Sequence, residues 1–89
     1  MRIYARIKGR VQGIGYRYFV VELGKKLALT GWVKNLPDGD VEGEAQGPED
    51  RIRDFLRQLE TGHAWARVDH VHHETIPENK NESGFQIKF

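Results

Sequence analysis

The sequence predicts an α+β domain in which two helices cover one face of an antiparallel sheet. Apolar residues alternate with polar ones in several short segments, and they recur every three or four residues in two longer ones. These segments follow one another as strand, helix, strand, strand, helix, strand, with an additional short strand at the C-terminal end. This order is the split β-α-β-β-α-β arrangement of ferredoxin-like domains.

The first strand is expected over residues 2–8, where Ile3, Ala5 and Ile7 point to one face. A helix follows, because apolar residues then return at helical spacing. Its apolar face is formed by Tyr16, Phe19, Val20, Leu23 and Leu27. Gly31 is expected just beyond the end of this helix.

Two strands and a tight turn come next. Residues 31–36 and 41–46 have strand patterns, and the sequence PDGD at 37–40 is typical of a turn. A second helix is expected to start at Pro48 and to end at Gly62, with two acidic residues in its first turn. Its apolar stripe consists of Ile52, Phe55, Leu56 and Leu59.

The last third contains two further strands around a polar segment. Alternation runs from Ala66 to Val68 and resumes out of phase at Val71, which predicts a bulge near His70. Residues 77–84 are polar, and residues 85–89 alternate again. In the predicted topology the first and third strands are neighbours. The basic outer face of the first strand should therefore pair with the acidic outer face of the third.

Composition narrows the classes of function. The chain has 89 residues, no cysteine and a formal net charge of +1, so we expect one domain spanning residues 1–89. A disulfide framework, a thiolate metal site and a cysteine nucleophile are excluded. No apolar run approaches the length of a membrane span or a signal peptide, and we expect a cytoplasmic monomer that does not bind membranes.

The most informative stretch is residues 9–17, which read GRVQGIGYR. Three glycines lie between a strand and a helix start, where backbone N–H groups can surround an anion. Arg17 adds a planar guanidinium that matches phosphate oxygens. Taken alone, such a loop is equally consistent with a plain tight connection. It lacks the third glycine of a dinucleotide-binding motif and the Lys-Ser/Thr pair of a Walker loop.

This stretch resembles the signature of the acylphosphatases, and residues 31–35, GWVKN, resemble their second motif. The resemblance implies hydrolysis of acyl phosphates to a carboxylate and inorganic phosphate, which would also act as an inhibitor. It implies that Arg17 holds the phosphoryl group and that Asn35 orients the attacking water. The expected substrate-binding residues, acting largely through backbone N–H groups, are Gln12, Gly13, Ile14, Gly15, Tyr16 and Arg17.

No cofactor is expected, because one guanidinium and backbone dipoles can supply the charge that phosphoryl transfer needs. A metal site is the alternative raised by His70, His72 and His73. Two of these imidazoles share a strand face, but the pattern places no further ligand to complete a site. The simpler interpretation is an exposed strand with titrating imidazoles.

Two non-enzymatic alternatives share the predicted topology. An RNA-binding module needs exposed aromatic side chains on the central strands. Tyr4 is the only candidate on the first strand, and Glu42, Glu44 and Gln46 on the third would repel RNA. A regulatory domain that binds a small ligand without turnover would not require Arg17 and Asn35 together.

Overall fold

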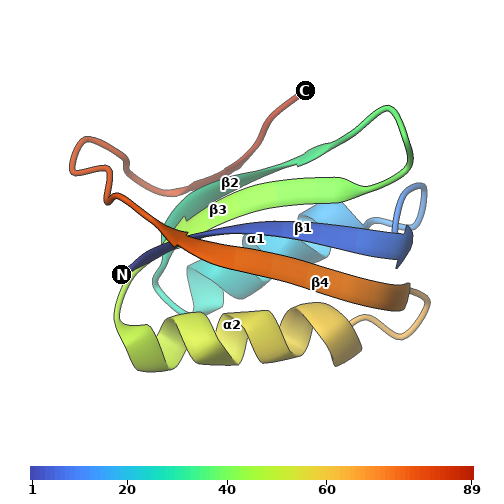
Figure 1. Cartoon of the computed structure of the whole chain (residues 1–89), viewed down its shortest axis with the longest axis horizontal. Helices are drawn as coiled ribbons and strands as arrows, with labels where there is room; N and C mark the ends of the chain where they lie inside the picture. Colours follow the sequence, from blue (N-terminus) through green and yellow to red (C-terminus); the bar gives the residue numbers. More distant parts are fainter.

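The computed structural model describes all residues, 1–89, and contains a five-stranded sheet and two helices (Figure 1). The elements in chain order are β1 (Arg2–Arg10), α1 (Tyr16–Lys26), β2 (Thr30–Asn35), β3 (Val41–Gln46), α2 (Glu49–Thr61), β4 (Arg67–Ile76) and β5 (Phe85–Ile87). Both helices lie on the same face of the sheet, as predicted. None of the helices is long and apolar enough to cross a membrane.

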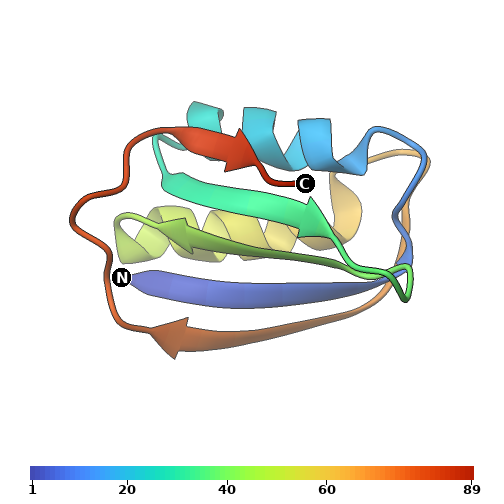
Figure 2. The same ribbon diagram turned by 90° about the horizontal axis from the view of Figure 1, so that it is seen from above.

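The strand order is β4-β1-β3-β2-β5, which confirms the split β-α-β-β-α-β topology. Strand β1 is central and pairs antiparallel with both β3 and β4. One part of the prediction is wrong, since the sheet is mixed. The short β5 ends at Ile87 and runs parallel to β2 (Figure 2), because the loop 77–84 carries the chain back across the sheet before the strand begins.

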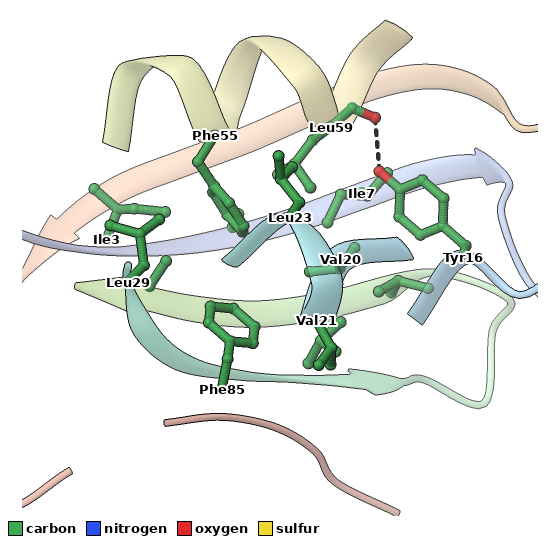
Figure 3. Packing of buried hydrophobic residues seen from close by; sticks show 14 of the residues in the cluster. Ile3, Ile7, Tyr16, Val20, Val21, Leu23, Leu29, Phe55, Leu59 and Phe85 are labelled. Atoms are coloured by element: carbon green, nitrogen blue, oxygen red, sulfur yellow. Dashed lines mark hydrogen bonds between the residues drawn. The ribbon is translucent and has the colours of Figure 1, made fainter. Parts of the chain in front are cut away.

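The core lies between the sheet and the two helices (Figure 3). The alternation in β1 places Ile3, Ala5 and Ile7 inward, each at most 2% exposed. From the helices, Val20 and Phe55 are among the side chains that pack against this layer. The predicted stripe of α2 is therefore confirmed, with Leu56 at its partly buried edge.

Helix boundaries differ from the prediction at two points. Helix α1 ends at Lys26, and the left-handed residue after it is Ala28 at φ 55°, with no glycine in that position. Gly31 instead lies inside β2, where a Cβ atom would come within 2.0 Å of the Glu44 carbonyl oxygen. The missing side chain of Gly31 therefore allows β2 and β3 to lie close together, and the residue does not end the helix. Helix α2 starts at Glu49, and Pro48 is its N-cap.

The bulge predicted near His70 is confirmed. Lys8 pairs with His70 and Gly9 pairs with Val68, so Asp69 is an extra residue on β4. The extra residue lies near the start of β4, where it bends the strand just after the preceding loop, residues 62–66. This loop, the loop that follows β1 and the turn at 36–40 meet at one end of the sheet (Figures 1 and 2).

Charge pairing on the outer face centres on Arg2, whose side chain is only 3% exposed. Its Nε donates to Glu44 at 2.9 Å, and its two terminal nitrogens donate to Glu82 at 2.8 and 3.1 Å. Glu82 belongs to the loop before β5, so this pairing fastens that loop to the central strand. The hydrogen bonds from Arg2 hold the pKa of Glu82 below its usual value.

We predict that Glu82→Gln lowers the free energy of unfolding at pH 7 by about 1.5–3 kcal/mol, the range for hydrogen bonds to charged groups. A carboxyl whose pKa is depressed in the folded state stabilises the protein above its unfolded pKa. That contribution disappears as the pH falls through the folded value. Urea unfolding between pH 7 and 2 should therefore show a weaker acid dependence for the variant than for the parent protein.

Glu78→Gln is the matched control, because Glu78 pairs only with the N-terminal ammonium and its side chain is 55% exposed. Exposed ion pairs of this kind contribute about 1 kcal/mol or less to the free energy of unfolding. If Glu82→Gln and Glu78→Gln lost equal free energies of unfolding at pH 7, the ion pair with Arg2 would not be what stabilises the loop before β5.

Candidate active site

A small pocket lies where β1 ends and α1 begins. Its volume is about 110 Å³. Pockets for drug-sized ligands typically have about 300–1,000 Å³, so this one suits a small group such as a phosphoryl. It is lined by Val11, Gln12, Gly13, Gly15, Tyr16, Arg17, Tyr18 and Asn35. The two separated sequence motifs thus contribute to one pocket.

The loop from β1 to α1 depends on left-handed backbone conformations. Gly13 and Gly15 have φ angles of 79° and 78°. Residues other than glycine adopt this left-handed conformation at a cost of roughly 1–2 kcal/mol each. Gly15 is the N-cap of α1 and provides no side-chain hydrogen bond to the first turn. The first helical bond runs from the Phe19 N–H to the Gly15 carbonyl, which leaves the earlier N–H groups without helical partners.

The two helix N-termini differ in charge. The first turn of α2 contains Glu49 and Asp50, whereas the first turn of α1 contains no acidic residue. The partial positive charge at the start of α1 is therefore not balanced by the protein itself. This end of the helix is suited to an external anion.

Arg17 is half-buried in the pocket wall and forms no ion pair with a carboxylate. Its guanidinium carbon lies 5.3 Å from the centre of the Phe89 ring, a cation–π contact that limits its orientations. Most other arginines of the chain, including Arg2 and Arg6, are paired with acidic side chains. The donors of Arg17 consequently remain available for a ligand.

Asn35 is the last residue of β2, and its Oδ1 is buried without a hydrogen-bond partner. An unsatisfied buried acceptor costs about 1–3 kcal/mol. Asn35 also lines the pocket, and a rotation of its side-chain amide would present this acceptor to a molecule that enters.

Gln12 connects the loop to the turn between β2 and β3. Its Nε2 donates to the carbonyl oxygens of Leu36 and Asp40, both at 2.8 Å. Both N–H bonds of this amide are therefore used within the protein, and the side chain has no donor left for a ligand. Its contacts fix the loop relative to Asn35, which lies next to Leu36.

Tyr16 and Ile14 serve mainly as packing residues. Tyr16 is 1% exposed, and its hydroxyl donates to the Leu59 carbonyl oxygen at 2.7 Å (Figure 3). Burial raises its pKa, so the hydroxyl is not suited to proton transfer. Ile14 is the one predicted binding residue outside the pocket wall, and its side chain packs against the core.

The sequence interpretation did not include Tyr18 or Phe89 in the site. Tyr18 lines the pocket and is 70% exposed, whereas Phe89 contacts Arg17. An exposed aromatic residue directly after the arginine of the loop was the available signal for Tyr18. Nothing in the spacing of Phe89, 72 positions after Arg17, indicated their contact.

The three histidines of β4 do not converge. His70 and His72 pair with Lys8 and Arg6 and share the outer face of the sheet, whereas His73 pairs with Ala5 on the other face. No group of three or more His, Asp or Glu side chains is arranged as a set of metal ligands. The histidines are also separate from the pocket.

Comparison with known proteins shows the same family over almost the whole chain. Residues 3–87 match the family model described as Acylphosphatase. An acylphosphatase of Geobacillus thermodenitrificans is 44% identical over 88 residues, covering 99% of this chain and 94% of that protein. The crystal structure of acylphosphatase from Bacillus subtilis has a TM-score of 0.94 at 34% identity, covering 99% of this chain and 98% of that one. An acylphosphatase from Coxiella burnetii has a TM-score of 0.90 at 38% identity, covering 98% and 90% of the two chains.

Proposed function

This chain belongs to the acylphosphatase family and hydrolyses acyl phosphates, and we propose that Arg17 binds the phosphoryl group while Asn35 positions the attacking water. We further propose that residues 1–89 act as one domain. The observation that supports these roles most directly is the composition of the small pocket. It combines an unpaired guanidinium, a helix N-terminus without acidic residues and a buried amide oxygen without a partner.

Phosphoryl transfer requires donors directed at the equatorial oxygens of the phosphoryl group. In this proposal the guanidinium of Arg17 binds two of these oxygens, and N–H groups of residues 12–17 bind the remaining lone pairs. These donors act most strongly on the transition state, where negative charge has to be stabilised in a small site. The glycines at 13 and 15 allow the backbone to surround the anion.

Water attacks the phosphorus atom, and the bond between phosphorus and the acyl oxygen breaks. The bonding electrons leave with the carboxylate, whose conjugate acid has a pKa far below 7, so no general acid is needed. Oδ1 of Asn35 accepts a hydrogen bond from the water and thereby orients its lone pair. As a neutral group, Asn35 does not repel the anionic substrate as a carboxylate would.

Direct attack by water is favoured over a covalent enzyme intermediate. The chain has no cysteine. Ser83, its only serine, lines a groove with Trp32 and the loop 77–84, away from the phosphate pocket. No serine or cysteine nucleophile therefore faces the substrate.

We predict that turnover of benzoyl phosphate continues unchanged in excess EDTA. Inorganic phosphate should inhibit competitively, raising KM without changing kcat, because it occupies the same pocket as the substrate phosphoryl group. Steady-state kinetics with dialysed enzyme test both points. Loss of activity with EDTA and its recovery with a divalent cation would contradict the proposal.

We also propose that the protein is a cytoplasmic monomer that does not bind nucleic acid. On the outer face of the sheet, the Tyr4 hydroxyl donates to Glu42, and Arg2 and Arg6 are paired with acidic residues. Carboxylates around Tyr4 disfavour stacking of a nucleic-acid base there. Only four large apolar side chains are exposed, those of Met1, Tyr18, Trp65 and Phe89, which favours a monomer.

A further inference from the structure

One side chain joins the loop of the phosphate pocket to the turn that follows Asn35. Nε2 of Gln12 donates to the carbonyl oxygens of Leu36 and Asp40, both at 2.8 Å. No other hydrogen bond connects residues 11–17 with residues 35–40. Among polar contacts, this one amide therefore sets how the phosphate loop lies relative to the end of β2.

The turn at 36–40 has hydrogen bonds of its own. The Leu36 N–H donates to the Asp40 carbonyl oxygen at 2.8 Å, and the Gly39 N–H donates to the Leu36 carbonyl oxygen at 3.2 Å. The Asp40 N–H donates to Oδ1 of Asp38 at 3.0 Å. These bonds hold the turn without help from Gln12, whose side chain adds a link between the turn and the phosphate loop.

Charged side chains of β1 hold the same turn from the outer face of the sheet. Nε of Arg6 donates to Oδ2 of Asp40 at 2.8 Å, and Nζ of Lys8 lies 3.4 Å from the same oxygen. The hydrogen bond from Arg6 holds the pKa of Asp40 below its usual value, so this carboxylate is ionised at neutral pH. The turn is thus fixed to the strand that leads into the phosphate loop, and Gln12 closes a ring of contacts from β1 through the turn to that loop.

The phosphate loop also has support that does not involve the Gln12 side chain. Tyr16, at the start of α1, is 1% exposed, and its hydroxyl donates to the Leu59 carbonyl oxygen at 2.7 Å (Figure 3). The guanidinium of Arg17 is oriented by the Phe89 ring. Loss of the Gln12 side chain should therefore leave the binding of phosphate in place.

Asn35 lacks comparable support. Its Oδ1 has no hydrogen-bond partner in the protein, so the reach of this amide into the pocket depends on the backbone at the end of β2. The next residue is Leu36, whose carbonyl oxygen accepts from Gln12. A group that holds an attacking water has to be placed closely, because a misplacement of about 1 Å can cost roughly 10²-fold in rate.

We propose that Gln12 is a positioning residue for the hydrolytic step, whose side-chain amide fixes the distance between the phosphate loop and Asn35. The proposal rests on the roles proposed above for Arg17 and Asn35. The side chain of Gln12 acts through the turn and does not bind the substrate, and only its backbone N–H belongs to the phosphate pocket.

Gln12→Met removes both donors and keeps the length of the side chain. We expect kcat for benzoyl phosphate to fall about 10- to 100-fold, the effect of a displaced reacting group. The affinity for inorganic phosphate, measured by calorimetry, should stay nearly unchanged. Gln86→Met is the matched control, because Gln86 is exposed on β5, and it should change neither quantity. A fall in phosphate affinity as large as the fall in kcat would make the Gln12 side chain a substrate ligand and overturn the proposal.

A double-mutant cycle distinguishes the positioning of Asn35 from a general loss of structure. If Gln12 acts through Asn35, adding Gln12→Met to Asn35→Ala should lower kcat by less than about twofold further, because coupled residues do not have additive effects. Independent effects would multiply. A further loss as large as the one that Gln12→Met causes in the parent enzyme would overturn the proposal.

Amide NMR tests the link without relying on activity. The Gly39 N–H donates to the same Leu36 carbonyl oxygen as Gln12, so its resonance reports on the turn. Saturating inorganic phosphate should shift the amide resonances of Gly13 and Gly15 in the parent protein and in Gln12→Met, but that of Gly39 only in the parent protein. Equal Gly39 shifts in both proteins would overturn the proposal. If Gly13 and Gly15 did not respond in the parent protein, the phosphate pocket itself would be refuted, and with it the function on which the proposal rests.

Discussion

Replacing Arg17 with alanine is expected to lower kcat/KM for benzoyl phosphate by roughly 10³-fold or more, the range found when an arginine that stabilises a transferring phosphoryl group is removed. Arg17→Lys should restore only a small part of this loss. A lysine ammonium carries the same charge but cannot bind two phosphoryl oxygens with parallel donors. It also makes a weaker contact with the Phe89 ring, which orients the guanidinium.

Phosphate affinity should fall together with the rate in both variants, because Arg17 is proposed to bind the ground state as well as the transition state. Isothermal titration calorimetry with inorganic phosphate measures this directly. Arg53→Lys is a suitable control, since Arg53 lies on the exposed face of α2 and its side chain is 75% exposed. An Arg17→Lys enzyme with nearly normal kcat/KM would show that the loop N–H groups hold the phosphate by themselves.

The part of the fold that the sequence predicts well is the part governed by local pattern. Alternation in β1 and the apolar stripe of α2 correspond directly to buried faces, because each element packs against one layer only. The phase break after Val68 also has a local cause, the single extra residue Asp69. Each of these features can be found within about ten residues of sequence.

Features that depend on contacts between distant segments were missed. Gly31 resembles a helix terminator, yet its role is to allow the Glu44 carbonyl oxygen close to β2. The direction of β5 depends on how loop 77–84 crosses the sheet, and Arg2 with Glu82 fixes that loop over 80 positions of sequence. Spacing along the chain carries no information about such pairings.

The candidate site also combines features that a local pattern predicts with features that depend on contacts between distant segments. Its glycine-rich loop is compact in sequence, so residues 9–17 alone were enough to predict an anion site formed by Arg17 and backbone donors. Asn35 was included only because a second motif was recognised, since a single asparagine at a strand end usually satisfies backbone groups. The contacts of Gln12 with the turn between β2 and β3 became visible only in the three-dimensional structure.

Asn35→Ala is expected to separate binding from chemistry. Loss of one positioned polar group at a reacting centre costs about 2.7–4 kcal/mol of transition-state stabilisation, or roughly 10²–10³ in kcat. Inorganic phosphate should still bind with nearly unchanged affinity, because its proposed ligands are Arg17 and the loop N–H groups. Single-turnover kinetics and phosphate titration by calorimetry, on the same preparations, give the two quantities.

The unfolding temperature of Asn35→Ala should not fall, although its activity does. Oδ1 of Asn35 is buried without a partner in the protein, so removing it relieves an unsatisfied acceptor, although the smaller side chain leaves some space. We therefore expect thermal unfolding of Asn35→Ala at a temperature equal to or above that of the parent protein, with Asn81→Ala in the loop before β5 as a neutral control. In the proposed mechanism this oxygen accepts a hydrogen bond from the attacking water, so its lack of a partner in the free enzyme costs stability. A parallel fall in phosphate affinity and rate would instead make Asn35 a phosphate ligand, and the water would need another partner.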